Sequence, residues 1–316
     1  IESLKDTMII RFRIDGHLEN IFIFELEFFN MLSSIIKLLS SLDISQRRIP
    51  QDGRFAKDIE NNSFDFRVSS LPTITGESIV LRILENSMVI KNMDSLGISE
   101  DNLVDIKESI KESAGMILVT GSTGSGKTTT LYSILEQLNN STKKIITVED
   151  PVEYHIENIQ QVNINPEIGL TFVDILKNIL RQDPDIIMIG EIRDAQSLSI
   201  AIQAALTGHL VLATLHTNDS ISTINRLIDL KTPPYLVAST VKTIISQRLI
   251  RKLCENCKEK VLIDNKEHYN PVGCNRCNIK GYIGREAVLE VLKIDNTISS
   301  MILRQENNSN ILKYAK

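Results

Sequence analysis

Residues 121–128 have the types and spacing that point most directly to chemistry. Their sequence, GSTGSGKT, fits the phosphate-loop pattern G-x-x-x-x-G-K-[ST] at every fixed position. In such a loop, backbone N–H groups surround a polyphosphate, the lysine neutralises its charge and the last hydroxyl binds Mg²⁺. We therefore predict that ATP is bound by Ser122, Thr123, Gly124, Ser125, Gly126, Lys127, Thr128 and Thr129, and that Thr128 also binds Mg²⁺.

The residues on either side of this loop support the prediction. Residues 116–120 (MILVT) form a short apolar run that predicts a buried strand. After the loop, Leu131, Ile134, Leu135 and Leu138 recur at helical spacing. The alternative is a glycine-rich turn that matches by chance, and it is less consistent with a strand before the loop and a helix after it.

Two acidic residues follow other apolar runs. Glu149 comes after residues 145–148 (IITV) and is our candidate for polarising the attacking water. Glu191 comes after residues 186–190 (IIMIG), where it is suited to bind Mg²⁺ directly or through water. Each could instead be a solvated acid at a strand end, but a phosphate loop in the same sheet favours catalytic roles.

Two histidines lie at opposite ends of the apolar run 210–215 (LVLATL). His216 follows the run, where a neutral imidazole could donate to a γ-phosphate and report its loss. His209 precedes the run and is more consistent with orienting a loop. A lone histidine is usually structural, so the placement of His216 at a strand end is what favours a functional role.

The four cysteines form the pattern C-x₂-C, sixteen residues, C-x₂-C. Cys254, Cys257, Cys274 and Cys277 can thus place two pairs of thiolates around one tetrahedral Zn²⁺. Disulfides and buried free thiols are the alternatives, and both fit this spacing less well. Because four protein ligands leave the metal no open position, we expect Zn²⁺ to be structural.

These residues fit an α/β fold with a mostly parallel sheet. Strands and helical patterns alternate over residues 101–250, as in sheets that are covered by helices. The predicted strands are 116–120, 145–148, 186–189 and 210–215. Ligands bind such sheets beyond the C-terminal ends of the strands, which is where the loop, both acids and His216 lie.

The whole chain divides into regions of different pattern. We expect a small α+β domain at 1–85, a linker at 86–100 and the phosphate-loop domain at 101–316, with a zinc subdomain at 250–285. In the first domain we expect a strand at 10–14, a hairpin turn at Asp15-Gly16, a helix over 31–42, and strands at 64–68 and 78–84 separated by a loop with Pro72 and Gly76. From about residue 286 we expect helix, with an asparagine-rich loop at 306–310.

Composition narrows the class of protein. The 316 residues carry a formal net charge of −5, which disfavours nucleic acid as the default partner. The most apolar stretch, 21–39, contains charged residues that a membrane-spanning helix rarely carries. Paired cysteines without an export signal indicate a reducing cytosol. A first residue other than methionine suggests a piece of a longer protein.

The motifs together resemble those of the type II secretion and type IV pilus assembly ATPases. The resemblance covers nearly the whole chain and is specific. It lies in residues 47–55, 65–73, 121–130, 146–154, 180–194, 208–218 and 247–251 and in the tetracysteine segment. Ser122 departs from the proline that is more usual in the family, which should matter little because the backbone makes the contact.

The resemblance implies a homohexameric cytoplasmic ATPase at the inner face of the cytoplasmic membrane. Such proteins dock on inner-membrane platform and docking proteins and drive assembly of pilin or pseudopilin subunits. It also implies that Glu149 assists water attack, that Glu191 serves Mg²⁺ and that His216 senses the γ-phosphate. Two arginines of the first domain, Arg67 and Arg82, would reach the phosphates, with Arg54 a weaker third candidate. The family's N-terminal docking domain is expected to lie outside this sequence.

Two other functions remain open on the residues alone. A nucleic-acid motor would also need a phosphate loop, and zinc knuckles can bind DNA, but the acidic balance disfavours it. A nucleotide-gated scaffold without turnover would not need the two glutamates.

Overall fold

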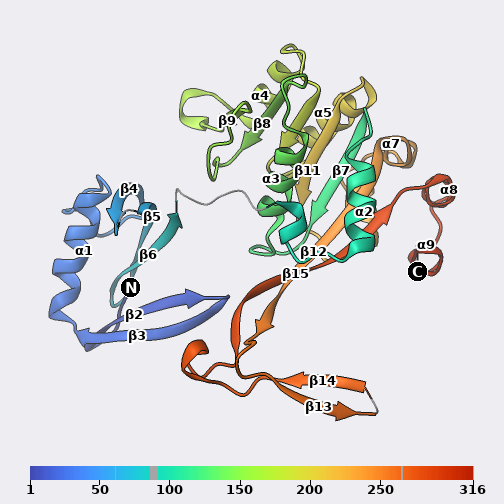
Figure 1. The fold of residues 1–316 in the computed structure, drawn as a ribbon. Coiled ribbons are helices and arrows are strands. Elements are labelled where there is room, and N and C mark those ends of the chain that lie inside the picture. The colour runs from blue at the N-terminus through green and yellow to red at the C-terminus, as the bar shows by residue number, and fades with distance from the viewer. Residues whose placement is uncertain (61, 86–91, 265, 316) are drawn as a thin grey trace. The chain divides into compact units, whose positions relative to one another are not determined.

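The computed structural model describes residues 1–60, 62–85, 92–264 and 266–315 (Figure 1). The chain divides into two compact units, Ile1–Val89 and Ile90–Lys316. Of the linker that we expected at 86–100, residues 86–91 lie outside the described residues. Met93–Ser95 form a 3-10 helix, and Met93 is buried in the second unit with residues of its core.

The first unit is a helix packed on an antiparallel sheet. Its elements are β1 (Glu2–Ser3), β2 (Thr7–Ile14), β3 (His17–Glu25), α1 (Glu27–Leu39), β4 (Gln51–Ile59), β5 (Asn62–Thr73) and β6 (Gly76–Glu85). The strands lie in the order β3-β2-β1-β6-β5-β4. Its core joins Phe29 and Ile36 of α1 to Met8, Val68 and Ile79 of the strands.

Most of the predicted elements of this unit are present, with shifted ends. Asp15 and Gly16 both have positive φ, of 49° and 90°, and connect β2 to β3 as expected for a two-residue hairpin. The helix begins earlier than predicted, at Glu27. A connection between β5 and β6 is present as predicted, but it is shorter than expected, because Pro72 lies inside β5 and Gly76 begins β6.

A buried ion pair lies beneath α1. Lys37 Nζ is 2.5 Å from Glu77 Oε1, and the two side chains are only 1% and 4% exposed. Lys37 also donates to the carbonyl of Gln46 at 2.8 Å, while Ser70 donates to the same Glu77 carboxylate at 2.9 Å. The pair therefore fixes the chain between α1 and β4 to the sheet.

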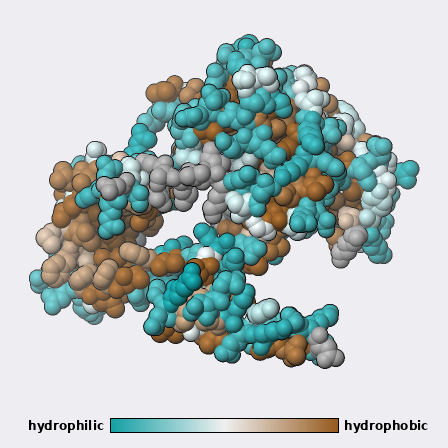
Figure 2. All heavy atoms as spheres, viewed as in Figure 1, coloured by the Kyte–Doolittle hydropathy of each residue, from teal (hydrophilic) through white to brown (hydrophobic). Residues whose placement is uncertain are grey.

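The same unit also exposes many large apolar side chains on α1 and on the β2–β3 hairpin. Figure 2 shows them as brown side chains over these elements. They include Phe22, Ile23, Phe28, Met31 and Leu38, each between 47% and 67% exposed. Apolar patches of this kind are uncommon on the free surface of soluble monomers and typically mark contact surfaces.

The second unit is a sheet with helices on both faces (Figure 1). Its elements are α2 (Glu100–Ser109), β7 (Gly115–Thr120), α3 (Lys127–Leu138), β8 (Ile145–Glu149), β9 (Gln160–Asn163), α4 (Phe172–Ile179), β10 (Ile186–Ile189), α5 (Ala195–Leu206), β11 (Leu210–Leu215), α6 (Ser220–Asp229), α7 (Pro234–Thr240), β12 (Val241–Leu253), β13 (Glu259–Ile263), β14 (Lys266–Asn270), β15 (Tyr282–Lys293), α8 (Asn296–Leu303) and α9 (Asn308–Ala315).

The order of its strands confirms the predicted mostly parallel sheet. The order is β15-β12-β7-β11-β10-β8-β9, and only the β12–β15 pair among these neighbours is antiparallel in the described residues. Met116 and Leu118 of β7 pack in one core cluster, whereas Ile117 and Val119 pack in the other. This alternation buries both faces of the central strand beneath helices.

The C-terminal part corrects one prediction. Residues 286–293 are not helical, because they belong to β15, which pairs with β12 from Thr243↔Lys293 to Leu253↔Tyr282. Leu289 and Val291 are less exposed than Val288 and Glu290, which is the alternation expected of a strand. The asparagine-rich loop is also shorter than expected, because α9 begins at Asn308.

In the part of the chain that the structure describes, no helix combines the length and apolar character needed to cross a membrane.

Candidate nucleotide-binding site

The predicted phosphate loop joins β7 to α3, at the C-terminal end of the central strand. Gly121, Gly124 and Gly126 have positive φ values of 148°, 76° and 88°. A Cβ at Gly121 would lie 2.3 Å from the Gln247 carbonyl oxygen, and one at Gly126 would lie 2.8 Å from Gln247 Nε2. Glycine is therefore required at both positions by backbone conformation and by space.

Gln247 of β12 supports this loop from the neighbouring strand. Its Nε2 donates to the carbonyl of Ser125 at 2.8 Å, and its Oε1 accepts from Thr130 Oγ1 at 2.7 Å. The side chain is 2% exposed. We did not predict this role. The signal in the sequence was a polar residue that closely follows the apolar pair Ile244-Ile245 in the segment that forms β12.

Lys127 begins α3 and its ammonium is held by the loop itself. Nζ donates to the carbonyls of Gly121 at 2.8 Å and Ser122 at 3.1 Å, and it lies 3.4 Å from His216 Nδ1. Partial burial lowers the pKa of Lys127, and the negative charge of Glu191 opposes that shift. A phosphate group would offer this cation stronger, charged acceptors than the two carbonyls.

Glu191 and His216 come together beside Lys127. They follow neighbouring parallel strands, β10 and β11, in which Ile189 pairs with Ala213. His216 Nε2 lies 3.2 Å from Glu191 Oε1. The two ring nitrogens of His216 thus face a cation on one side and an acid on the other.

Arg193 adds a cation to the same edge, and sequence reasoning missed it. Its Nε donates to Glu191 Oε2 at 2.8 Å, and one terminal nitrogen lies 3.4 Å from Asp150 Oδ2. The hydrogen bond to Glu191 raises the pKa of Arg193. The usable signal was an arginine two residues after Glu191, in the segment that follows β10.

Glu149 ends β8 but its carboxylate belongs to a different cluster of contacts. The residue is 3% exposed. Its Oε2 accepts from the hydroxyl of Tyr132, and its Oε1 accepts from Thr147 at 2.6 Å and from Gln161 Nε2 at 3.3 Å. The described contacts therefore join Lys127, His216 and Glu191, and they anchor Glu149 to α3 and β9.

His209 has a structural environment at the start of β11. Its Nδ1 lies 2.9 Å from the carbonyl oxygen of Ala204 and 3.1 Å from Thr207 Oγ1. These contacts tie the turn after α5 to the strand, as the sequence suggested.

The arginines of the first unit form a row across its sheet. Arg54 of β4 pairs with Arg67 of β5, and Arg67 pairs with Arg82 of β6. Residues directly opposite in antiparallel strands share a face, with Cβ atoms about 5 Å apart. Val68 and Ile79 face the core, so this row lies on the sheet face away from α1. Like charges directly opposite one another in such a row are destabilising.

The four cysteines converge as a metal site requires. The Sγ atoms of Cys254 and Cys274 are 3.9 Å apart, and those of Cys257 and Cys277 are 3.8 Å apart. A tetrahedron with Zn–S bonds of about 2.3 Å has edges of about 3.8 Å, so the donor set fits Zn²⁺. All four sulfur atoms lie within 4.8 Å of one another.

Hydrogen-bond donors and burial shift the pKa values of these thiols. The backbone N–H groups of Gly273 and Gly281 donate to the sulfurs of Cys257 and Cys277, at 3.3 and 3.2 Å. The hydrogen bond from Asn256 lowers the pKa of Cys274 to about 6, whereas burial raises the pKa of Cys257 to about 12. N–H groups aimed at sulfur are what thiolate ligands need around them.

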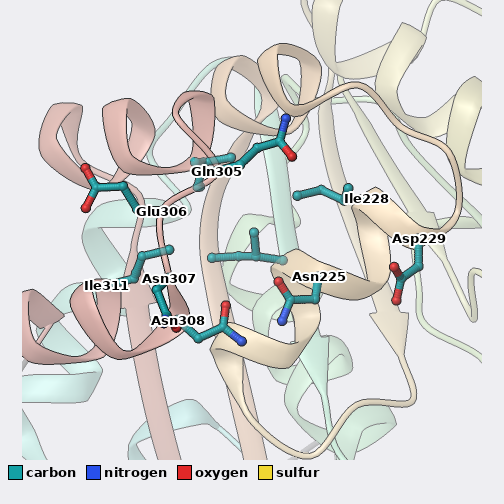
Figure 3. Close-up of a pocket in the computed structure, with 10 residues that line it drawn as sticks. Asn225, Ile228, Asp229, Gln305, Glu306, Asn307, Asn308 and Ile311 are labelled. Carbon is teal, nitrogen blue, oxygen red and sulfur yellow. The ribbon is translucent and has the colours of Figure 1, made fainter.

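A pocket of about 360 Å³ lies elsewhere in the second unit (Figure 3). Its lining combines isoleucines with amides and two acids: Ile224, Asn225, Ile228, Asp229, Ile302, Gln305, Glu306, Asn307, Asn308 and Ile311. These residues come from α6, from α8 and α9 and from the turn between the last two. The lining contains no cation, which a polyphosphate would need.

A glycine loop between a central parallel strand and a helix, with an acid and a histidine at neighbouring strand ends, defines a P-loop nucleoside-triphosphatase fold. Residues 1–316 match the model of the family described as Type II/IV secretion system protein, and the chain belongs to this family.

Individual relatives are similar over most of this chain. It is 42% identical to the type II secretion system ATPase E of Vibrio cholerae, over 96% of this chain and 63% of that protein. It is 44% identical to the type IV pilus assembly ATPase PilB of Myxococcus xanthus, over 96% of this chain and 56% of that protein. The chain thus spans less than two thirds of the length of these relatives.

A solved structure supports the fold. The pilus retraction motor PilT, crystallised with bound ADP, superposes with a TM-score of 0.69 at 26% identity. The match covers 99% of this chain and 84% of that chain.

Proposed function

We propose that this chain is the ATP-hydrolysing motor of a type II secretion, type IV pilus or DNA-uptake machine, where it powers assembly of pilin or pseudopilin subunits. The observation that carries the proposal is the contact chain from Lys127 of the phosphate loop through His216 to Glu191. The names of the relatives, a secretion ATPase and a pilus assembly ATPase, support the same reading.

The phosphates of ATP bind at the N-terminus of α3, contacted by residues 122–129. Lys127 exchanges its loop carbonyls for phosphate oxygens. Thr128 and Glu191 hold Mg²⁺, which neutralises charge on the β- and γ-phosphates when bound. His216, already between Lys127 and Glu191, is placed to contact the γ-phosphate.

Glu149 orients the attacking water. Arg67 and Arg82 supply cations for the charge that develops on the phosphoryl group, with Arg54 as the third member of the row. The first unit is thus the arginine-bearing domain, and the second is the catalytic domain with its zinc subdomain. The four cysteines hold Zn²⁺ in a structural role, because their geometry leaves no position for substrate.

The protein works as a homohexamer in the cytoplasm, at the inner face of the cytoplasmic membrane, with platform and docking proteins of the machine as partners. The exposed apolar surface of α1 and the β2–β3 hairpin supports protein contacts of this kind. The net charge of −5 speaks against nucleic acid as the partner.

Steady-state phosphate release and nucleotide binding test the proposal. Lys127→Ala should abolish ATP binding or turnover, whereas Lys143→Ala, a lysine in the loop between α3 and β8, should change neither. Glu149→Gln should bind ATP normally and hydrolyse it at least about a hundredfold more slowly. Turnover that is unchanged in Lys127→Ala would refute an ATPase at this loop. Stimulation by DNA, without stimulation by lipid vesicles, would favour a nucleic-acid motor instead.

A further inference from the structure

The carboxylate of Glu149 is held by neutral donors from three different elements. Tyr132 lies on α3, Thr147 on β8 and Gln161 on β9, and together they reach both carboxylate oxygens. A buried carboxylate needs such donors, because its charge is otherwise strongly disfavoured away from water. The position of this side chain is therefore set by its hydrogen bonds and not by packing alone.

Tyr132 is the most constrained of the three donors. Its side chain is fully buried, and its ring forms a T-shaped pair with that of Tyr154, with the ring centroids 4.5 Å apart. The hydroxyl oxygen accepts from the backbone N–H of Glu153 at 3.3 Å, so its own proton is directed to Glu149. Burial and the adjacent Glu149 charge raise the pKa of Tyr132 well above its ordinary value, which keeps this hydroxyl a donor.

The location of Tyr132 links this acid to the phosphate loop. Tyr132 lies five residues after Lys127 in the same helix, α3 (Lys127–Leu138). The helix whose first turn contains the last two residues of the phosphate loop thus also fixes the carboxylate at the end of β8. Thr147 lies on the same strand as Glu149, so it cannot provide this connection.

We propose that Tyr132 is a positioning residue for Glu149, which sets the orientation of that carboxylate relative to the bound phosphates. The inference rests on the proposed role of Glu149 in orienting water. Without the hydroxyl, Glu149 Oε2 loses its donor in a buried site, and the carboxylate turns toward other donors. A displacement of about 1 Å in a reacting group can cost up to a hundredfold in rate.

Four proteins in a double-mutant cycle test the inference: the unchanged chain, Tyr132→Phe, Glu149→Gln and the double variant. We expect Tyr132→Phe to lower kcat at least about tenfold and to leave KM for ATP within about twofold. In the Glu149→Gln background the same change should alter kcat by less than about twofold, because the carboxylate on which it acts is gone. Single-turnover phosphate release makes the slow variants measurable.

Tyr154→Phe is the matched control. It removes a hydroxyl from the same aromatic pair, while the hydrogen bond from Tyr132 to Glu149 stays. Its kcat should stay within about twofold of the unchanged chain. Thermal unfolding and nucleotide binding, measured on every variant, show that the fold is retained.

The outcomes separate the inference from the function on which it rests. If Glu149→Gln alone leaves turnover unchanged, the proposed role of Glu149 fails. If Glu149→Gln slows turnover but Tyr132→Phe costs the same factor in both backgrounds, Tyr132 acts elsewhere and the inference is overturned. A higher kcat in Tyr132→Phe would overturn it as well, because the hydroxyl would then restrain Glu149.

Discussion

The side-chain amide of Gln247 donates to the carbonyl of Ser125 at 2.8 Å, across 122 residues of sequence. This bond ties the phosphate loop to β12, while the other end of the same amide accepts from Thr130 in the first turns of α3. The loop is thereby held at Ser125, and the helix that follows it is held at Thr130. A nucleotide bound at this loop, as we propose, would meet backbone N–H groups that are already oriented, which would reduce the entropy lost on binding.

Gln247→Met should weaken nucleotide binding, because it keeps the side-chain length but leaves the Ser125 carbonyl without its donor. We expect the Kd for ADP to rise at least about fivefold, measured by calorimetry. Thr130→Val removes only the second contact of Gln247, so it should lower the melting temperature and keep Kd within about twofold. Equal Kd values for Gln247→Met and the unchanged chain would show that the loop needs no support from β12.

His216→Ala should reduce the discrimination between ATP and ADP, because its imidazole lies between Lys127 and Glu191, where a γ-phosphate would be placed. We expect the ratio of the two dissociation constants, measured with a non-hydrolysable ATP analogue, to move toward one, with kcat reduced at least about tenfold. His209→Ala, at the other end of β11, should leave the ratio as it was. A changed ratio in both variants would point to a general effect on the strand.

Lys37→Met should destabilise the first unit by about 3–5 kcal/mol, because it leaves the buried Glu77 carboxylate without its partner. Native-state hydrogen exchange of the α1 amides measures this locally. The matched change is Arg11→Met, whose partner Glu2 is 33% exposed, and it should cost less than about 1 kcal/mol. If the two variants lost similar amounts of unfolding free energy, burial would not explain the contribution of the Lys37–Glu77 pair.

Cys274→Ser should release the metal without disabling the nucleotide site. Metal analysis should give one Zn²⁺ per unchanged chain and much less in the variant, with faster hydrogen exchange confined to the ends of β12 and β15 and to β13 and β14. ADP affinity should stay within about threefold, because the Gln247 contact lies earlier on β12. A protein without zinc that is as protected as the zinc-bound one would refute a structural metal.

The local pattern of apolar and polar residues was sufficient to predict the central strands of the sheet. Strands β7, β8, β10 and β11 match the predicted runs within one residue at each end, because each is a short apolar segment that ends in polar residues. The phosphate loop could be predicted for the same reason, since its conformation depends on glycines that lie close together in sequence.

The rest depended on partners that are distant in sequence. Residues 286–293 form part of strand β15 because β12 lies beside them, and this pairing overrides their helical tendency. Likewise, Tyr132 has the spacing of an ordinary buried helix residue, and only the fold shows that its hydroxyl meets Glu149. Gln161 reaches that carboxylate from β9, a short strand that the pattern did not reveal.

The register of the first unit has a consequence for how its positive charges behave. Arg54, Arg67 and Arg82 lie opposite one another on three adjacent strands of one sheet, so the backbone positions of the three are fixed relative to one another. Replacing one arginine would leave the other two in the same register. If the arginines act on ATP as proposed, we therefore expect a single replacement to reduce ATP turnover but not to abolish it.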